Sequence, residues 1–463
     1  TSEASVNIAV TSGTVKVTAE IGELKTYSGV NLSGTSDDVI EETATAGKFT
    51  NGGTVEKDGN TIKITGITPG DKVTFPITIK NLSNVNVKYR TAVEKSADSD
   101  ANLYGALEFT IGGMIVAGKS SWYELAPATD DNGTVIATYE CSIELPSTVS
   151  GEDYMGKTCN LSFKVEAVQG NASTTTYAPG ITTKNFDEAQ NVEYTNNLGN
   201  VVTGNKPAVA AYVDGEGQVK YVGDIYSAVK NGASVIYCKE GVTLRMRERL
   251  EDTNRTPDLT KDLIIYANGA DFQYGEISMN MTDAGKAANI TLRVLDAKNI
   301  KIWGATPNDG VKQNIVLENC HNEGETATGE KGVLLYITGN TGTVNAIVKN
   351  CYVSKNSSGI YMSTNGSLTV LDSTFVECAT GIKSSYKGTG IRNDLIENCT
   401  FVNCGCTKEM AGTTDWLYND SAAIKCKNSN GGKFNLTLKN NTITGTIGDK
   451  GDMQIDAKVN VTK

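Results

Sequence analysis

Side chains that could carry out acid–base chemistry gather in the C-terminal half of the chain. Arg392 stands beside Asp394, and Lys383 and Lys387 lie shortly before them. Elimination from an acidic polysaccharide requires carboxylates that hold Ca²⁺ near an arginine or lysine base, and these four residues are the nearest candidates. A solvated turn is the simpler interpretation, so we predict no catalytic residue, no metal ion and no cofactor.

Aromatic side chains offer a binding chemistry instead. Trp416 and Tyr418 lie in the segment 408–420, which we expect to protrude as a loop, and Tyr336, Tyr361 and Tyr386 lie in neighbouring repeats, the last two at near-equivalent places. A contiguous group of such rings could bind a glycan or a protein partner. Plain packing of the five rings is the alternative.

The elements that must position these residues are short repeats. A degenerate sequence repeat contains three short apolar runs. Alignment of its equivalent residues Val333, Ile360, Ile382 and Ile424 gives steps of 27, 22 and 42 residues. Three brief strands per repeat, separated by Gly, Asn and Ser, are typical of the coils of a parallel β-helix. The longer steps are then loops inserted into a constant frame.

One corner of each repeat is also regular. A pair of small residues recurs there in successive coils, as Asn319-Cys320, Asn350-Cys351, Asp372-Ser373, Asn398-Cys399 and Asn440-Asn441. Stacked coils lie about 4.8 Å apart. We therefore expect ladders in which the amides bond along the stack and the cysteines fill the interior corner as core thiols.

Composition limits the classes of function. The chain has 463 residues, with 42 Lys and Arg against 53 Asp and Glu, and a formal net charge of −11. This charge argues against binding to nucleic acid or to an anionic membrane surface, and no apolar run of about eighteen residues predicts a membrane span. Of the ten cysteines, Cys141 and Cys159 lie on consecutive predicted strands. The sequence is equally consistent with a disulfide between these two cysteines and with two free thiols.

Residues 1–172 predict a separate antiparallel domain. Apolar and polar residues alternate through about eight segments, the first of them within residues 6–21, which is enough for a β-sandwich. The segment Ser5–Val10 at its start has two outcomes, because it can pair within its own sheet or be donated to a neighbouring subunit.

The same region resembles a known family. The stretches ITPGDKVTFPITIKNLSNVNVKYRTAVE from Ile67, CSIELP from Cys141 and YMGKTCNLSFKVEAVQGNA from Tyr154 are similar in order and spacing to the TasA/camelysin-type domain. The resemblance implies a jelly-roll-like sandwich, secretion by a Gram-positive bacterium and assembly into extracellular fibres of a biofilm matrix. It also implies donation of the N-terminal strand. Some members are described as metalloproteases, but the only histidine here is His321 and no H-E-x-x-H motif occurs.

A second domain is predicted from about residue 219. Asp224 can cap and Gly232 can end a short helix that covers the open end of a solenoid, and residues 173–218 read as a linker. This helix and the strand after it resemble the entry of right-handed β-helix proteins of the pectate-lyase-like superfamily, a likeness of fold over about residues 219–463. The predicted fold is all-β: an N-terminal jelly-roll-like β-sandwich followed by a right-handed parallel β-helix.

These patterns together predict a secreted, non-enzymatic structural protein outside the cell or on its surface. Its subunits would form a homopolymer by donating the strand Ser5, Val6, Asn7, Ile8, Ala9 and Val10, while the β-helix displays loops for adhesion to a glycan or surface partner. Two alternatives stay open. One is a lyase-like enzyme acting on a polysaccharide, whose activity Arg392→Ala abolishes, and the other is a monomeric adhesin that binds glycan through Trp416.

Overall fold

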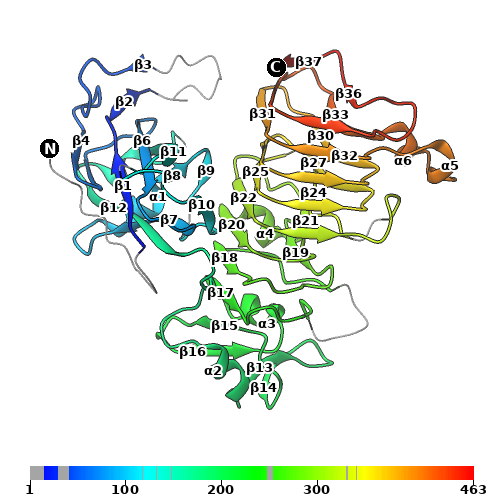
Figure 1. Ribbon diagram of the computed structural model, residues 1–463, viewed down its shortest axis with the longest axis horizontal. Helices are drawn as coiled ribbons and strands as arrows, with labels where there is room; N and C mark the ends of the chain where they lie inside the picture. The colour runs from blue at the N-terminus through cyan, green and yellow to red at the C-terminus, as the bar shows by residue number, and fades with distance from the viewer. Residues whose placement is uncertain are drawn as a thin grey trace. The chain divides into compact units, whose positions relative to one another are not determined.

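The computed structural model describes residues 15–29, 41–116, 118–131, 133–147, 149–247, 254–329, 332–339 and 341–463. The chain divides into two compact units, Thr1–Thr174 and Thr175–Lys463, and strands dominate both (Figure 1). Within the described ranges, no helix has the length and apolar character needed to cross a membrane.

The first unit is a sandwich of two antiparallel sheets. One sheet contains β1 (Val17–Ile21), β2 (Lys25–Ser28), β3 (Glu41–Glu42), β6 (Lys72–Asn81), β8 (Glu108–Ile111), β9 (Met114–Ile115) and β11 (Val135–Glu144). The other contains β4 (Thr54–Asp58), β5 (Thr61–Thr65), β7 (Val87–Lys95), β10 (Tyr123–Leu125) and β12 (Thr158–Gln169). Helix α1 (Ala101–Ala106) and the 3-10 turn η1 (Gly151–Tyr154) lie in connections between these strands.

Alternation along the strands builds the core of this sandwich. Every second residue of β6 is buried, including Phe75, whose ring meets that of Phe163 on the opposite sheet edge-on at 5.1 Å. Pro76 is tolerated in the middle of β6 because β1 pairs with residues 77–81 and β2 with residues 72–74. The proline therefore lies where the neighbouring strand changes, and its missing N–H leaves no gap in a ladder.

The segment predicted to be a linker has structure of its own. It contains α2 (Thr183–Glu188), β13 (Val192–Thr195), β14 (Val201–Gly204) and β15 (Ala210–Val213), followed by β16 (Val219–Val222) and α3 (Ile225–Lys230). Phe186 and Val192 belong to a small apolar core of this region, which explains why the segment is ordered. Helix α3 is the predicted capping helix: Asp224 accepts a hydrogen bond from Ser227 N at 2.8 Å, and Ile225 and Ala228 join the β-helix core.

Three parallel sheets then form the β-helix. The first continues through β17 (Val235–Cys238), β18 (Leu263–Tyr266), β20 (Ile290–Leu295), β22 (Lys312–Glu318), β25 (Thr343–Lys349), β28 (Ser367–Leu371), β31 (Ile391–Glu397), β34 (Lys433–Lys439) and β37 (Val459–Thr462). The second, called the groove sheet below, comprises β19 (Glu276–Met279), β21 (Lys301–Ala305), β24 (Leu335–Thr338), β27 (Ser358–Ser363), β30 (Thr380–Tyr386), β33 (Ala422–Asn428) and β36 (Met453–Ile455). The third comprises β23 (His321–Glu323), β26 (Tyr352–Ser354), β29 (Thr374–Val376), β32 (Thr400–Val402) and β35 (Thr442–Thr444).

Short helices interrupt the coils. Helix α4 (Asp283–Ala287) precedes β20, and α5 (Lys408–Ala411) and α6 (Asp415–Asn419) form an excursion between β32 and β33. Figure 1 shows α5 and α6 projecting from the stacked coils. This excursion is the loop that the sequence predicts to protrude.

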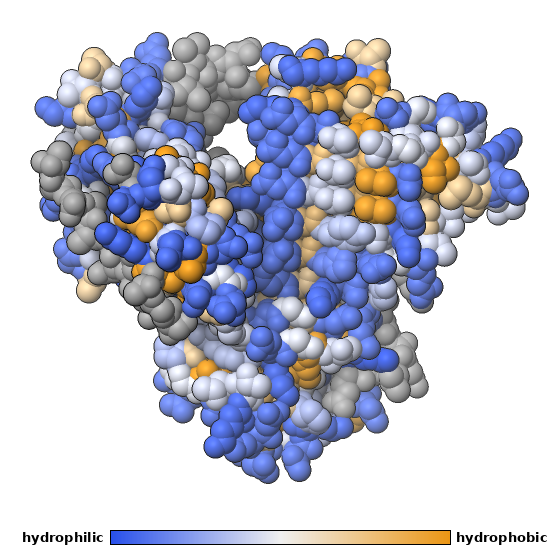
Figure 2. Space-filling model, in the orientation of Figure 1, coloured by the Kyte–Doolittle hydropathy of each residue, from blue (hydrophilic) through white to orange (hydrophobic). Residues whose placement is uncertain are grey.

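Equivalent residues stack from coil to coil. Figure 2 shows the result on one face as columns of similar hydropathy that run along the coils. The predicted corner ladder is present: Asn319, Asn350 and Asn398 adopt φ of 50° to 55°, and Asn350 Nδ2 donates to Asn319 Oδ1 at 3.3 Å. Asparagine suits this corner because it tolerates positive φ and its amide bonds along the stack.

Candidate functional site

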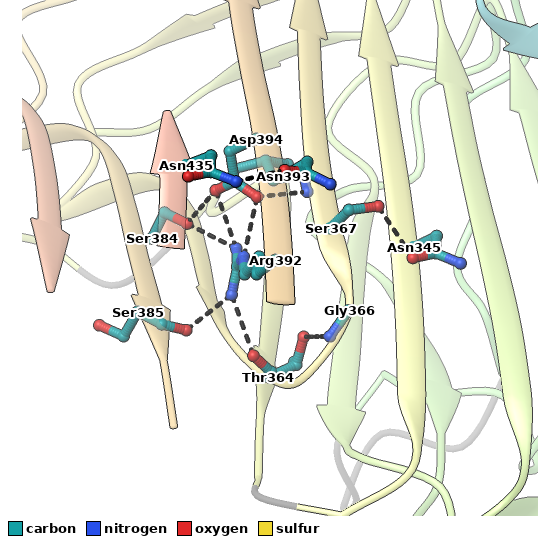
Figure 3. Close-up of polar contacts among 11 residues, drawn as sticks. Asn345, Thr364, Gly366, Ser367, Ser384, Ser385, Arg392, Asn393, Asp394 and Asn435 are labelled. Carbon is teal, nitrogen blue, oxygen red and sulfur yellow. Dashed lines mark hydrogen bonds and ion pairs between the residues drawn. The ribbon is translucent and has the colours of Figure 1, made fainter. Parts of the chain in front are cut away.

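The predicted catalytic candidate is part of the core. Arg392 and Asp394 lie on β31 with side chains 0% and 1% exposed, and Arg392 Nε lies 2.8 Å from Asp394 Oδ1. The guanidinium also donates to the carbonyl oxygens of Thr364 at 3.0 Å and Ser385 at 2.7 Å (Figure 3). The prediction of an exposed turn or a base at Arg392 is therefore wrong, because burial alternates along β31 and turns residues 392, 394 and 396 inward.

The outer face of the groove sheet carries a continuous row instead. Consecutive strands bring six residues into register, here called the sheet row: Trp303, Tyr336, Tyr361, Lys383, Lys425 and Gln454. Neighbouring strands lie about 4.8 Å apart, so the row extends roughly 24 Å along the β-helix. One half of the row is aromatic, and the other half carries two positive charges and an amide.

Cation–π contacts organise the aromatic half. The rings of Tyr336 and Tyr361 lie 5.0 Å apart and are tilted by 58°. Lys383 Nζ lies 4.6 Å from the centre of the Tyr361 ring, and the Arg255 guanidinium lies 3.9 Å from the centre of the Trp303 ring. Such contacts hold cations against the electron-rich ring faces. They therefore fix the orientation of the rings before any ligand arrives.

A groove of about 700 Å³ covers the charged half of the row. Its lining includes Tyr361 and Gln454, and its charged residues are Lys383, Lys387, Lys425, Lys427, Asp420 and Asp456. Asp420 follows α6 and bridges the row: its Oδ2 lies 2.5 Å from Lys383 Nζ, and its Oδ1 lies 2.8 Å from Lys425 Nζ. The groove thus already holds one carboxylate between two ammonium groups.

Asp420 is ionised in this setting. Burial raises the pKa of its carboxyl, but hydrogen bonds from Lys383 and Lys425 and their charges outweigh that effect and leave the pKa below its usual value. A carboxylate of this kind is a poor proton donor. Its role is to hold the two lysines and to attach the α5–α6 excursion to the groove sheet.

The stabilising effect of Asp420 should depend on pH. Because its pKa is lower in the folded protein than the value of about 3.9 in an unfolded chain, its contribution is complete above about pH 5 and is lost as the pH falls through the folded-state value. We expect wild type to lose stability relative to Asp420→Asn on acidification, as measured by thermal unfolding between about pH 3 and pH 7. A difference between the two proteins that stays constant over that range contradicts the assignment.

Two of the five predicted rings, Tyr336 and Tyr361, come together in the sheet row, but the other three do not join them. Tyr361 belongs to the sheet row, but Tyr386 is 2% exposed and packs edge-on against Phe434 inside the β-helix. Trp416 is 43% exposed on α6, and Tyr418 donates to Asp449 at 2.8 Å. The predicted contiguous group holds for Tyr336 and Tyr361 and is wrong for Tyr386, because Tyr386 lies three positions after Lys383, the row neighbour of Tyr361, and so faces the opposite side of the sheet.

The remaining site predictions concern a disulfide, a donor strand and a metal ion. Cys141 on β11 and Cys159 on β12 belong to different sheets of the sandwich, and both are free, so the disulfide is not formed. The predicted donor segment Ser5–Val10 lies outside the described residues. In the part of the chain that the structure describes, no group of three or more His, Cys, Asp or Glu is placed to hold a metal ion.

Known proteins match the β-helix at the level of fold. Residues 290–457 match the family model of the right-handed β-helix region. Three solved structures resemble the chain, and all are catalytic domains of GH87 α-1,3-glucanases. One, in complex with tetrasaccharides, is 10% identical, with 91% of this chain and 97% of that chain covered at a TM-score of 0.19. Another, in complex with nigerose, is 11% identical, with 87% and 92% covered at a TM-score of 0.18. No curated protein matches.

The family model confirms the predicted right-handed β-helix over residues 290–457. The similar structures are catalytic domains of enzymes rather than fibre subunits, and no finding supports polymerisation by strand donation. The prediction of a non-enzymatic fibre subunit is therefore unsupported, and we do not retain it. At TM-scores of 0.17 to 0.19 the likeness carries no argument about the activity or the ligand of this chain, so both questions rest on the geometry of the sheet row.

Proposed function

We propose that the β-helix binds an acidic polysaccharide lengthwise along the sheet row. The observation that carries this proposal is the register of the row, which places Trp303, Tyr336 and Tyr361 before Lys383 and Lys425 on consecutive strands. An extended sugar chain is itself a repeat of similar units. A row of equally spaced side chains is suited to such a ligand, because each coil presents one contact to each successive stretch of chain.

The two halves of the row supply different contacts. The exposed apolar surface of the aromatic rings contacts the apolar faces of sugar rings, and the tyrosine hydroxyls bond to sugar oxygens. Lysine ammonium groups bind carboxylates or sulfates by charge-assisted hydrogen bonds. The position of Asp420 between Lys383 and Lys425 supports an acidic ligand, because it shows that this part of the groove accommodates a carboxylate.

Two more lysines are available to such a ligand. Lys387 and Lys427 line the groove, and neither ammonium group has an ion pair or hydrogen-bond partner among the described residues. Four lysines thus face two aspartates in a protein whose net charge is −11. The positive charge of the groove attracts a polyanion, and the negative charge of the rest of the protein repels it. The polyanion is therefore directed to the groove.

The location of the protein is part of the proposal. The resemblance of residues 1–172 to the TasA/camelysin-type domain implies secretion, and secretion would bring the groove to extracellular polysaccharides. Whether the β-helix also cleaves its ligand is a separate question. Assays for unsaturated and reducing products, run on the same polymers, distinguish an enzyme from a binding protein.

Removing one ring tests the aromatic half of the site. We expect wild type to be retarded in native gels that contain polygalacturonate, and Tyr361→Ala to bind about 3- to 10-fold more weakly, because the aromatic ring next to the charged half of the row is lost. Tyr352→Ala is the matched control, since Tyr352 is 38% exposed on the third sheet, outside the row. Equal losses in both variants, or no retardation of wild type, would refute the proposed site.

A further inference from the structure

The interior of the β-helix contains two rows of stacked thiols. The first row occupies the corner after the asparagine ladder and comprises Cys320, Cys351, Ser373, Cys399 and Asn441 in five successive coils. The second follows the third sheet and pairs Cys378 with Cys404 in adjacent coils. None of these cysteines belongs to the sheet row, and all five are at most 3% exposed.

Backbone hydrogen bonds fix the register of both pairs. Tyr352 N donates to Cys320 O at 3.0 Å, and Gly405 N donates to Cys378 O at 2.9 Å, so each cysteine stands directly over its partner. The neighbouring thiol, together with burial, raises the pKa of Cys320 and of Cys378. Four sulfurs are thus held as two close pairs by the parallel ladder itself.

The spacing of the coils suits a covalent bond within each pair. In-register residues of neighbouring parallel strands lie about 4.8 Å apart, and disulfides join cysteines whose Cα atoms are about 4.4–6.8 Å apart. Cys351 and Cys399 are two coils apart, and Ser373 stands between them and donates to Leu371 O at 2.8 Å. That separation, near 10 Å, excludes a bond between them.

Three other thiols have no such neighbour. Cys426 lies in register with Ser384 and Ile455, and Cys141 and Cys159 lie on strands of different sheets in the first unit. The registers of the parallel sheets therefore place two pairs of described cysteines in adjacent coils, Cys320 with Cys351 and Cys378 with Cys404.

We propose that Cys320–Cys351 and Cys378–Cys404 are sites of coil-to-coil disulfides that close while the β-helix folds in an oxidising environment. The oxidant is a small disulfide such as oxidised glutathione, which reaches the cysteines before the coils close. One protein thiolate attacks this disulfide and releases one small thiolate. The partner thiolate then attacks the mixed disulfide and releases the second. The two cysteines lose two protons and two electrons, and one small disulfide becomes two small thiols.

Each disulfide should stabilise the stacked coils against unfolding. Each bond closes a loop of about 25–30 residues, which restricts the unfolded chain. We expect each disulfide to raise the midpoint of thermal unfolding by roughly 5–10 °C. Burial would also shield the finished bonds from reductants, whereas the paired thiols of a chain folded under reducing conditions stay reduced, since packing excludes the oxidant.

Refolding of the full chain tests the inference. Denatured protein is refolded with reduced and oxidised glutathione, denatured again in an alkylating reagent, and mapped by peptide mass spectrometry. We expect four of the ten cysteines to be protected, as the linked peptides Cys320–Cys351 and Cys378–Cys404. Refolding in dithiothreitol supplies the reference with ten alkylated cysteines and the lower unfolding temperature.

Serine variants separate the two pairs. Ser373 already occupies a cysteine position of the corner row, so Cys351→Ser should fold, and it should lose the first linkage while keeping the second. Cys378→Ser should do the reverse, and Cys426→Ser, at an unpaired site, should keep both. Alkylation of all ten cysteines after refolding in glutathione, or linkages that join other residues, would overturn the inference.

Discussion

Replacement of Arg392 by methionine should lower the free energy of unfolding by about 3–5 kcal/mol. The variant keeps most of the side-chain volume but leaves the Asp394 carboxylate buried without its guanidinium partner. It also removes the donor that satisfies the carbonyl oxygens of Thr364 and Ser385. Breaking one side of a buried ion pair is costly because the remaining charge stays desolvated. Urea unfolding followed by circular dichroism measures the loss.

Lys387→Met is the control for this change. It removes a positive charge from the same coil, but its ammonium group lines the open groove and not the core. We expect its effect on stability to stay within about 0.5 kcal/mol. If Arg392→Met were as stable as wild type, the network drawn in Figure 3 would not hold these coils together.

Removing both lysines of the sheet row should weaken binding to an acidic polysaccharide by about 10- to 100-fold. Lys383 and Lys425 are the charged members of the row, and their side chains are each 18% exposed, so a bound carboxylate would be only partly screened by water. The double variant Lys383→Ala/Lys425→Ala should lose this contact, and titration calorimetry against polygalacturonate measures the loss.

Two further variants isolate the cause of that loss. Lys433→Ala removes an exposed lysine from β34, on a different sheet, and should leave the affinity unchanged. Asp420→Asn should raise the affinity, because it releases both lysines from their internal counter-ion. A double lysine variant that binds as well as wild type would show that the ligand does not use the charged half of the row.

Much of the β-helix follows from its repeats. The Asn–Cys corners predict the ladder because a residue that tolerates positive φ must return at every equivalent turn, and Asn319 and Asn350 do so. The capping helix is equally local, since Asp224 makes its cap within one turn. These features depend on short-range stereochemistry, which a single sequence displays.

The direction of side chains was harder to predict, since it depends on register. The predicted alignment begins at Val333, but the strand residue that pairs with Ile360 is Leu335, two positions later. The residue after each aligned position faces outward, and reading Tyr336, Tyr361 and Lys383 in that frame would have revealed the sheet row. The burial of Arg392 is hard to predict for a related reason. A charged side chain favours an exposed position, but the alternation of burial along β31 places this one in the core.

The α5–α6 excursion illustrates a further limit. Its protrusion was predictable from the length of the insertion between repeats, but its contact with the row was not. Asp420 reaches Lys383 from 37 residues away in the chain, and nothing local to either residue indicates that they meet. Pairings of this kind arise from the stacking of coils and need three-dimensional structure.

The most direct measurement compares one polymer with and without its charge. Titration calorimetry of the wild-type protein with polygalacturonate and with its fully methyl-esterified form holds the sugar backbone constant and removes only the carboxylates. Binding along the sheet row predicts that the acidic form binds at least about 10-fold more tightly and that added salt reduces the difference. Equal affinity for the two polymers, or no binding of either, would contradict the proposed function.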